Sequence, residues 1–223
     1  MAFYTWTIIP ITAGILCIVM AAYALRRDAK SWSNRFLAVT LFLLAFWALN
    51  VGIVSNMASD MELALIATKI QMACLCFAPF TLVLMAYSFF KPIDRRSLTV
   101  LTVPLVMVLI TIFGPSPLYS ELAEWGVRIV YDKDLYMILM LIAALALIYM
   151  FAILYKLYQN PKITGSTRRK FRIFIIGLMI TSITGVVLET CSAFMDVIPP
   201  LGSVGAAVGM SISTYSFLKS SDK

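Results

Sequence analysis

Two ionisable side chains, Lys69 and Glu189, lie inside long apolar stretches of this 223-residue sequence. Charged groups are costly inside a bilayer and usually face the interior of a helix bundle. In helical geometry both residues lie roughly 10–12 Å below the same membrane surface, so they can form an ion pair if their helices touch. Gln71, Asn50 and Thr190 lie at similar or slightly different depths and could complete a polar cluster. The cluster is either a structural ion pair, with Lys69 extending outward along its stem, or an outward-facing ligand-binding site.

Other residue types exclude several kinds of chemistry. The sequence contains no histidine, which excludes histidine-ligated haem, histidine-based zinc sites and Ser-His catalytic triads. The four cysteines, Cys17, Cys74, Cys76 and Cys191, all fall in apolar stretches, so we expect small packing side chains rather than a disulfide framework. A retinal pigment is excluded because segment 201–218 contains no lysine for a Schiff base. No residue set supports acid–base or nucleophilic catalysis, and we expect no enzyme activity, no cofactor and no metal site.

The amino-acid composition indicates that the chain is surrounded by lipid and not by water. The chain is 61% hydrophobic and 13% charged, with a mean hydropathy of +0.93, whereas soluble domains are about 45–50% apolar and about 25% charged. Helices that cross a membrane need about 20 apolar residues. Seven segments meet or approach this length: 4–25, 36–55, 61–90, 98–113, 135–158, 171–195 and 201–218. We therefore predict an all-α membrane protein, with residues 1–223 forming a single seven-transmembrane helix bundle.

The loops between these segments differ sharply in charge. Fifteen Lys and Arg residues fall on one side, and only Arg128 and Lys133 on the other. The positive-inside rule then places the N-terminus outside and the C-terminus in the cytoplasm of a prokaryotic cell membrane. The first segment lacks a basic start and a small-residue cleavage site, so we expect it to be retained. The net charge of +7 is explained by topology and contact with anionic lipids, and we expect no nucleic-acid partner.

Two features outside the polar cluster have structural meaning. The outer loop, 114–134, contains a weakly alternating run at 126–131 that predicts a short strand or hairpin over the outer end of the bundle. At the start of the last segment, Pro200 fixes the first turn, and Gly202, Gly205 and Gly209 follow it. The Gly-x-x-x-Gly spacing of Gly205 and Gly209 allows close helix packing or a homodimer.

A family resemblance rests on four groups of residues in a fixed order along the chain. They are Asn34-Arg35-Phe36 with Phe46-Trp47-Ala48-Leu49, Ala67-Thr68-Lys69-Ile70-Gln71 with Phe77-Ala78-Pro79-Phe80, Arg168-Arg169-Lys170-Phe171 with Gly177, and Ile198-Pro199-Pro200-Leu201-Gly202-Ser203-Val204-Gly205. In these residues the chain resembles the N-terminal seven-transmembrane region of membrane histidine kinases. The resemblance implies a sensory module of a two-component system, which receives an extracellular or intramembrane stimulus and passes it through the last helix to a cytoplasmic transmitter.

The sequence ends at Lys223 and contains no kinase domain. We therefore expect the module to signal through a separate cytoplasmic or membrane partner, with the basic loop 156–172 and the tail 219–223 as the contacting surfaces. Two other functions fit the same segments. A small-solute transporter or channel would lose its flux when Lys69 or Glu189 is replaced. A structural subunit of a larger membrane complex would tolerate the double change Lys69→Met, Glu189→Leu.

Overall fold

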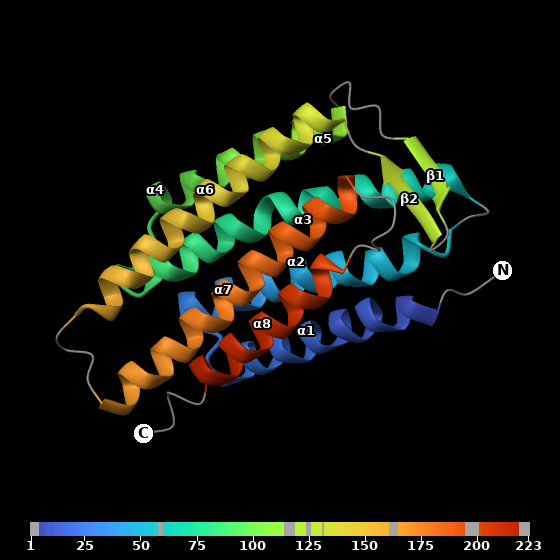
Figure 1. The fold of residues 1–223 in the computed structure, drawn as a ribbon. Helices are drawn as coiled ribbons and strands as arrows, with labels where there is room; N and C mark the ends of the chain where they lie inside the picture. The colour runs from blue at the N-terminus through green and yellow to red at the C-terminus, as the bar shows by residue number, and fades with distance from the viewer. Residues whose placement is uncertain are drawn as a thin grey trace.

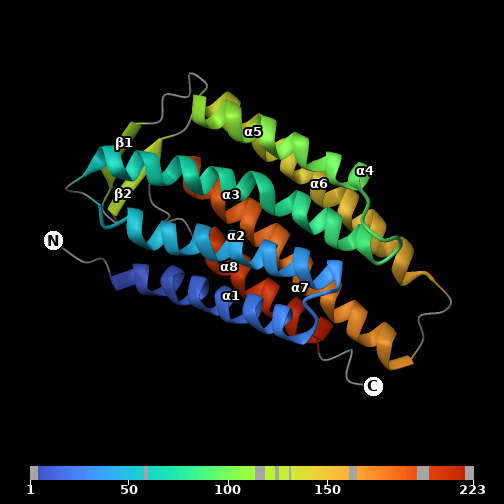
Figure 2. The same ribbon diagram turned by 180° about the vertical axis from the view of Figure 1, so that it is seen from behind.

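The protein is a bundle of long helices that lie side by side along a common direction (Figures 1 and 2). The computed structural model describes residues 5–57, 60–113, 119–123, 126–130, 132–160, 165–194 and 201–218. After a 3₁₀ turn at Thr5–Thr7, the long helices are α1 (Ile8–Arg27), α2 (Trp32–Val54), α3 (Met61–Ser88), α6 (Lys133–Tyr158), α7 (Gly165–Phe194) and α8 (Gly202–Leu218). Among the described residues, α1, α2, α3, α6 and α7 are long and apolar enough to cross a membrane. The predicted helical membrane bundle is therefore confirmed, while seven crossings stay a prediction.

The fourth predicted segment, 98–113, is not one regular helix. A short helix, α4 (Arg95–Leu98), leads through a 3₁₀ turn, η2 (Thr99–Leu101), into α5 (Thr102–Phe113). Pro104 accounts for the change, because it has no N–H to donate to the carbonyl of Val100 four residues earlier. The helical run therefore covers 95–113 and begins before the predicted boundary. The predicted boundary of α7 is also too late, since the helix starts at Gly165 and not at 171.

Asp94 caps the short helix α4. Its Oδ1 accepts hydrogen bonds of 2.7 Å from both the hydroxyl and the backbone N–H of Ser97. These hydrogen bonds, that from the hydroxyl first, lower the pKa of the Asp94 carboxyl. A lowered pKa in the folded state means that the cap stabilises α4 above the unfolded-state pKa of about 3.9 and is lost as the pH falls through the folded value.

We expect Ser97→Ala to raise the pKa of Asp94 toward its ordinary value, because one of the two donors is removed. A pH titration of ¹³C-labelled aspartate carboxyls by NMR measures this directly. Thr99→Ala is the control, since the Thr99 hydroxyl donates to the carbonyl of Arg96 instead. An equal shift in both variants would contradict the assignment of the cap.

Helices α1 and α2 approach closely through two glycines. A Cβ atom on Gly14 of α1 would lie 2.6 Å from Cγ of Leu49, and one on Gly52 of α2 would lie 2.6 Å from Cγ1 of Ile11. Small interface residues let helix backbones approach in a membrane, where packing rather than water exclusion drives association. The two glycines therefore set the distance between α1 and α2.

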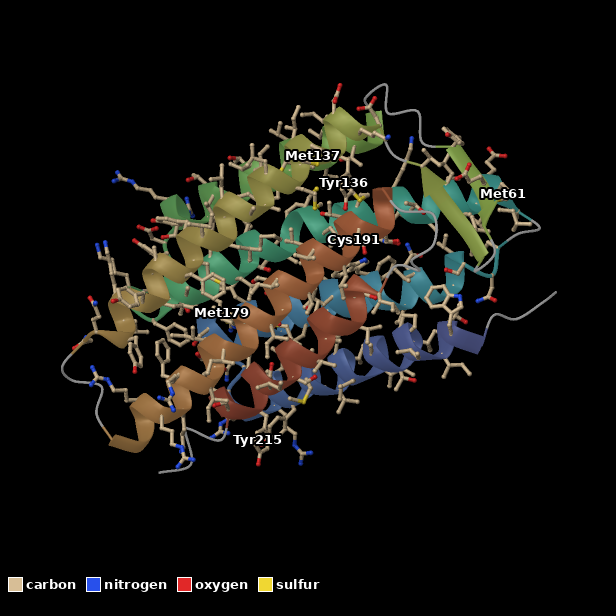
Figure 3. The ribbon with its side chains drawn as sticks, in the orientation of Figure 1. Met61, Tyr136, Met137, Met179, Cys191 and Tyr215 are labelled. Carbon is tan, nitrogen blue, oxygen red and sulfur yellow. The ribbon has the colours of Figure 1, made fainter. Side chains whose placement is uncertain are left out.

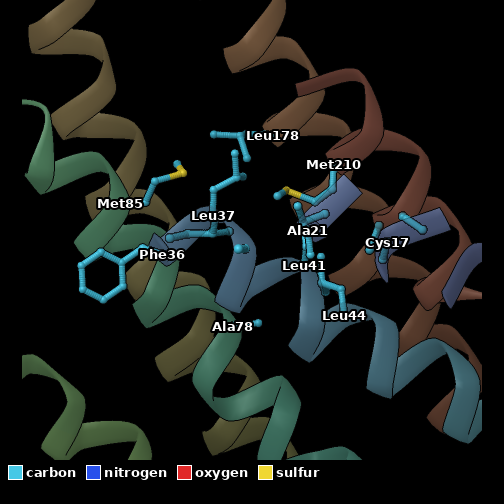
Figure 4. Close-up of a cluster of buried hydrophobic side chains, with 14 of the residues drawn as sticks. Cys17, Ala21, Phe36, Leu37, Leu41, Leu44, Ala78, Met85, Leu178 and Met210 are labelled. Atoms are coloured by element: carbon cyan, nitrogen blue, oxygen red, sulfur yellow. The ribbon is translucent and has the colours of Figure 1, made fainter. Parts of the chain in front are cut away.

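The main core joins α1, α2, α3, α6, α7 and α8. Leu37 and Leu41 of α2, Ala21 of α1, Leu178 of α7 and Met210 of α8 are buried together in it (Figure 4). A second cluster of buried side chains joins α3, α5 and α6: Met72, Cys76, Phe80, Met107, Val108, Tyr136 and Leu139. Helices α3 and α6 both contribute to the two clusters and so link the two parts of the bundle.

A β-hairpin covers one end of the bundle, where α2 ends and α3 begins (Figures 1 and 2). Strand β1 (Tyr119–Ala123) pairs antiparallel with β2 (Gly126–Val130). The backbone N–H of Val127 donates to the carbonyl of Ser55 at 3.2 Å, and the Val127 side chain packs with Val54 and Ala64. The predicted hairpin at this end is therefore present and is attached to α2 and α3.

The outer surface of the bundle is apolar along its length. Large hydrophobic side chains on α1, α6 and α7 are about half exposed or more, including Val19, Leu141, Ile148 and Ile183. Met137 and Tyr215, at 52% and 60% exposed, mark the same kind of surface on α6 and α8 (Figure 3). A surface of this kind fits contact with lipid and not with water.

Charged residues are divided between the two ends of the bundle. The described basic residues of the loops and helix ends gather where α1, α3 and α6 end and α2, α4 and α7 begin: Arg26, Arg27, Lys30, Arg35, Lys91, Arg95, Arg96, Lys156, Arg168, Arg169, Lys170 and Arg172. The opposite end holds Asp60, Glu62, Glu121, Asp132 and Asp134, together with Lys133. We call these the basic end and the acidic end. By the positive-inside rule, the basic end is expected in the cytoplasm.

Cysteine labelling tests this orientation. In a background with the four native cysteines replaced by alanine, we expect Glu62→Cys at the acidic end to react with a membrane-impermeant maleimide in intact cells. Gln159→Cys at the basic end should react only after the membrane is permeabilised. Both positions are exposed, so a difference in labelling reports the side of the membrane. The reverse labelling pattern would overturn the predicted orientation.

Candidate intramembrane binding site

A cavity of about 60 Å³ lies within the bundle, between the helices that form the two hydrophobic clusters. At ~15 Å³ for each water molecule, it has room for about four. Its lining comes from α2 (Thr40, Leu44, Trp47), α3 (Leu75, Ala78, Pro79, Leu82), α6 (Met140, Ala143, Leu147), α7 (Thr181, Ser182, Gly185, Val186, Glu189) and α8 (Ala206). The walls are therefore mostly apolar, with a few polar groups, as in small-molecule sites.

The cavity exists because several small or irregular residues face one another. Helix α7 packs along much of α8 and makes far fewer contacts with α6. Ala78, Ala143 and Gly185 line the space from three different helices and leave it unfilled. Pro79, in the middle of α3, has no N–H, so the carbonyl of Leu75 loses its usual helical partner at the cavity wall.

Glu189 is the ionisable residue of this lining. Its side chain is 5% exposed, and its Oε2 atom is buried without a hydrogen-bond partner in the described part of the chain. The oxygen lies beside the first residue of α8, because a Cβ atom on Gly202 would be only 3.0 Å from it. Glycine at this position thus makes room for the carboxyl group next to a helix N-terminus, which favours negative charge.

Trp47 provides a second unsatisfied polar atom. The side chain is 2% exposed, and its Nε1 atom is buried without a hydrogen-bond partner among the described residues. Its ring lies near α7, with Cη2 3.8 Å from the Cβ position of Gly185, one turn before Glu189. Trp47 and Glu189 therefore both line one cavity, and each has a buried polar atom without a partner among the described residues.

The other polar groups of the lining already have partners. The hydroxyls of Thr40 and Thr81 lie 2.8 Å apart and are hydrogen-bonded between α2 and α3. The Thr181 hydroxyl donates to the carbonyl of Gly177 at 3.0 Å, and the Ser182 hydroxyl donates to that of Leu178 at 2.9 Å. These hydroxyl groups are satisfied by the helices themselves and stabilise them.

The predicted polar cluster is divided in the structure. Glu189 lines the cavity, whereas Lys69, Gln71, Asn50 and Thr190 do not. Asn50 instead donates from Nδ2 to the carbonyl of Ala67 at 2.5 Å and joins α2 to α3, and Gln71 is buried on α3.

The predicted ion pair between Lys69 and Glu189 requires contact between α3, which carries Lys69, and α7, which carries Glu189. These two helices face one another across the cavity, with Pro79 and Leu75 on one side and Glu189 on the other. Oε2 of Glu189 has no hydrogen-bond partner among the described residues, and Glu189 lines the cavity together with Trp47. The ion pair between Lys69 and Glu189 stays a prediction.

The predicted packing glycines of α8 all face α7 of the same chain. Cβ atoms on Gly205 and Gly209 would lie 2.5 Å from Thr184 and Thr181 respectively, and Gly202 faces Glu189. Pro200, the fourth predicted packing residue, lies outside the described residues. The Gly-x-x-x-Gly spacing is therefore used for intramolecular packing against α7.

Sequence reasoning did not assign Trp47 to the site. The available signal was an indole N–H within an apolar helix, which needs a partner when buried. Pro79 was also visible as a proline in the middle of a spanning segment. Neither the indole nor the proline reveals which other helix packs against its own helix.

Comparison with known proteins gives one match. A family model described as the N-terminal 7TM region of histidine kinase matches residues 9–220. The match includes every residue that lines the cavity. No curated protein and no solved structure matches the chain.

Proposed function

Because the chain belongs to the family of N-terminal seven-transmembrane regions of histidine kinases, we propose that it is a membrane sensory module that receives its stimulus at the intramembrane cavity and signals to a separate partner at the basic end. The family match over residues 9–220 carries this proposal. The family suggests a membrane sensory module, and the cavity supplies a site where a stimulus could act. The basic end offers the charged surface expected of a cytoplasmic contact.

The helix pair α7–α8 is the proposed route from the cavity to the basic end. The Ser213 hydroxyl of α8 donates to the carbonyl of Phe174 at 2.9 Å, and the Ser216 hydroxyl donates to that of Lys170 at 2.8 Å. Together with the close approach at Gly209, these hydrogen bonds join α7 to α8, so neither helix can shift alone without breaking them. A stimulus that favours one position of the pair would change the basic surface, provided that it binds the two states with different affinity.

An aromatic cluster links this pair to α3 near the basic end. Phe89, which follows α3, lies edge-on to Phe171 and Phe174 of α7, with ring centroids 6.4 Å apart in both cases. A movement of α7 would therefore also change its contact with the end of α3. This arrangement supports signalling through the basic end.

We also propose that all seven segments cross the membrane. Helix α8, with 17 residues, is about 26 Å long at 1.5 Å per residue, close to the ~30 Å hydrocarbon thickness. The run 95–113 is of similar length. An odd number of crossings places the two termini on opposite sides of the membrane, and a cytoplasmic basic end then puts the N-terminus outside and the C-terminus inside.

Affinity purification from native membranes tests the proposal. In mild detergent, with mass spectrometry of the bound proteins, we expect a histidine kinase or another two-component signalling protein to copurify. Arg168→Gln with Arg169→Gln should reduce its recovery several-fold, because two charges of the basic end are lost. Lys133→Gln, at the acidic end, is the control and should leave recovery unchanged. Recovery of a stoichiometric non-signalling membrane complex, or of the protein alone, would contradict the proposal.

A further inference from the structure

A second pocket, of about 360 Å³, lies at the basic end of the bundle and shares no residue with the intramembrane cavity. Its lining comes from α3 (Val83, Leu84, Tyr87), from the start of α4 (Asp94, Arg96, Ser97), from η2 (Val100) and from α6 (Tyr149). We propose that this pocket, called here the headgroup pocket, holds the headgroup of a zwitterionic phospholipid, with its phosphate at Arg96 and its amine at Asp94. The proposal concerns a different site from the proposed sensory function and goes beyond it.

The headgroup pocket has an apolar floor and an open, polar rim. Val83 and Leu84 are 4% and 2% exposed, so they form its floor. Asp94 and Arg96 are exposed, and Tyr149 is 57% exposed, so these three side chains lie at the outer surface of the bundle. A volume of about 360 Å³ falls within the range of about 300–1,000 Å³ that is usual for small-molecule sites. The pocket is therefore large enough and open enough to admit a headgroup.

The pocket lies at the depth where the hydrocarbon of a bilayer gives way to headgroups. Tyr87 directly precedes Ser88, the last residue of α3. Tyr149 lies roughly 13–14 Å before the end of α6, at 1.5 Å per residue. Tyrosine is enriched at this depth because its ring is apolar and its hydroxyl is polar. A lipid phosphate at this level can meet the pocket without leaving the membrane surface.

The charges of the lining favour a zwitterionic headgroup over an anionic one. Among the described residues, the lining has one basic side chain, Arg96, and one acidic side chain, Asp94. A guanidinium group binds phosphate oxygens through paired N–H donors. A carboxylate can accept about four hydrogen bonds, so the two that Asp94 accepts from Ser97 leave capacity for an amine. An anionic headgroup without an amine would pair with Arg96 but face Asp94 with no positive group.

An apolar surface leads from the pocket toward the middle of the bilayer. Leu141, Leu145 and Tyr149 follow one another at four-residue spacing and therefore lie on one face of α6. They are 61%, 57% and 57% exposed, respectively. Because α6 runs from the acidic end to the basic end, the two leucines lie deeper in the membrane than Tyr149. An acyl chain can lie along this face, which favours a lipid over a soluble phosphate ester as the occupant.

Native mass spectrometry of the full chain in detergent tests the proposal with added lipids of matched acyl chains. We expect phosphatidylethanolamine to bind about three- to fivefold tighter than phosphatidylglycerol, the range that an exposed ion pair supports. The basic end as a whole attracts anionic lipid, so such a preference points to the acidic side chain of the pocket. Equal affinity would mean lipid contact without selection, and tighter phosphatidylglycerol binding would mean an anionic site. Either result would overturn the proposal.

Three variants locate the headgroup. Asp94→Asn removes the charge but keeps a good N-cap residue for α4, and it should abolish the preference for phosphatidylethanolamine. Arg96→Gln should weaken both lipids by about three- to fivefold, because both carry the phosphate. Arg95→Gln is the matched control, since this neighbouring exposed arginine does not line the pocket and its loss should leave the preference and both affinities unchanged.

Two outcomes of the variant series would also overturn the proposal. If Arg95→Gln and Arg96→Gln weakened binding equally, lipid binding would follow the net charge of the basic end and not the headgroup pocket. If the preference for phosphatidylethanolamine survived Asp94→Asn, the amine would lie elsewhere. Circular dichroism of each variant confirms that the helix content is retained, so that a loss of binding reports the site and not the fold.

Discussion

Replacing Gly209 with alanine is expected to lower the midpoint of thermal unfolding by about 5–10 °C, for a loss of roughly 2–3 kcal/mol from overpacking. An added Cβ atom would lie 2.5 Å from the backbone nitrogen of Thr181 and 2.6 Å from the carbonyl oxygen of Gly177. Both atoms belong to the α7 backbone, so a side-chain rotation cannot relieve the clash. Helix α8 must instead move away from α7, with loss of the hydrogen bonds from Ser213 and Ser216.

Gly185→Ala is the matched control for this change. The nearest atoms to its added Cβ would be 3.8 Å away, an ordinary contact distance. Alanine is also the better helix former by about 1 kcal/mol. Thermal unfolding in detergent, followed by circular dichroism, should therefore show an unchanged or slightly raised midpoint for Gly185→Ala. Similar midpoints for the two variants would mean that α7 and α8 are not packed as described.

Replacing Glu189 with leucine is expected to raise the unfolding midpoint in the absence of ligand, by about 3–8 °C. A buried polar group without a hydrogen-bond partner costs about 1–3 kcal/mol, and leucine in an apolar cavity does not have this cost. A residue whose removal stabilises the fold is kept for another reason, as is common at functional sites.

Double-mutant analysis separates this expectation from a structural ion pair. If Glu189 and Lys69 were paired, each single change, Glu189→Leu or Lys69→Met, would leave one buried charge alone and destabilise the protein by about 3–5 kcal/mol. We expect instead that Glu189→Leu stabilises and that its effect adds to that of Lys69→Met within ~0.5 kcal/mol. Glu62→Leu, at an exposed position of the acidic end, controls for the loss of a carboxylate. A strong coupling between residues 69 and 189 would instead support the ion pair.

The membrane class and most helix positions could be predicted from the sequence alone. An apolar stretch must be long enough to cross the bilayer, and this length is counted along one segment without knowledge of its neighbours. The same applies to the run at 126–131, predicted as a short strand or hairpin, because its alternation is a local property. The start of α7 and the break between α4 and α5 were missed because charged residues at a membrane surface and a proline near a helix start are both compatible with helix. The family resemblance was confirmed by the match over residues 9–220.

The composition of the site could not be predicted in this way. Residue numbers give the depth of a side chain in the membrane, and for that reason Lys69 and Glu189 were placed at one level. They do not give the direction in which the side chain points or the helix that it meets, since both depend on how all the helices pack. The close α7–α8 contact at Gly205 and Gly209, and the weaker contact of α7 with α6, leave a cavity between α3 and α7.

Sequence therefore determined that this is a helical membrane protein of the histidine kinase 7TM family, because hydropathy and ordered motifs are properties of the chain itself. Only the tertiary structure decided that Glu189 lines the same cavity as Trp47, although the two residues are 142 positions apart in the chain. It also decided that the glycines of α8 face α7. The physical reason is that contacts between distant segments depend on the rotation and spacing of whole helices, which the packing of the bundle sets as a unit.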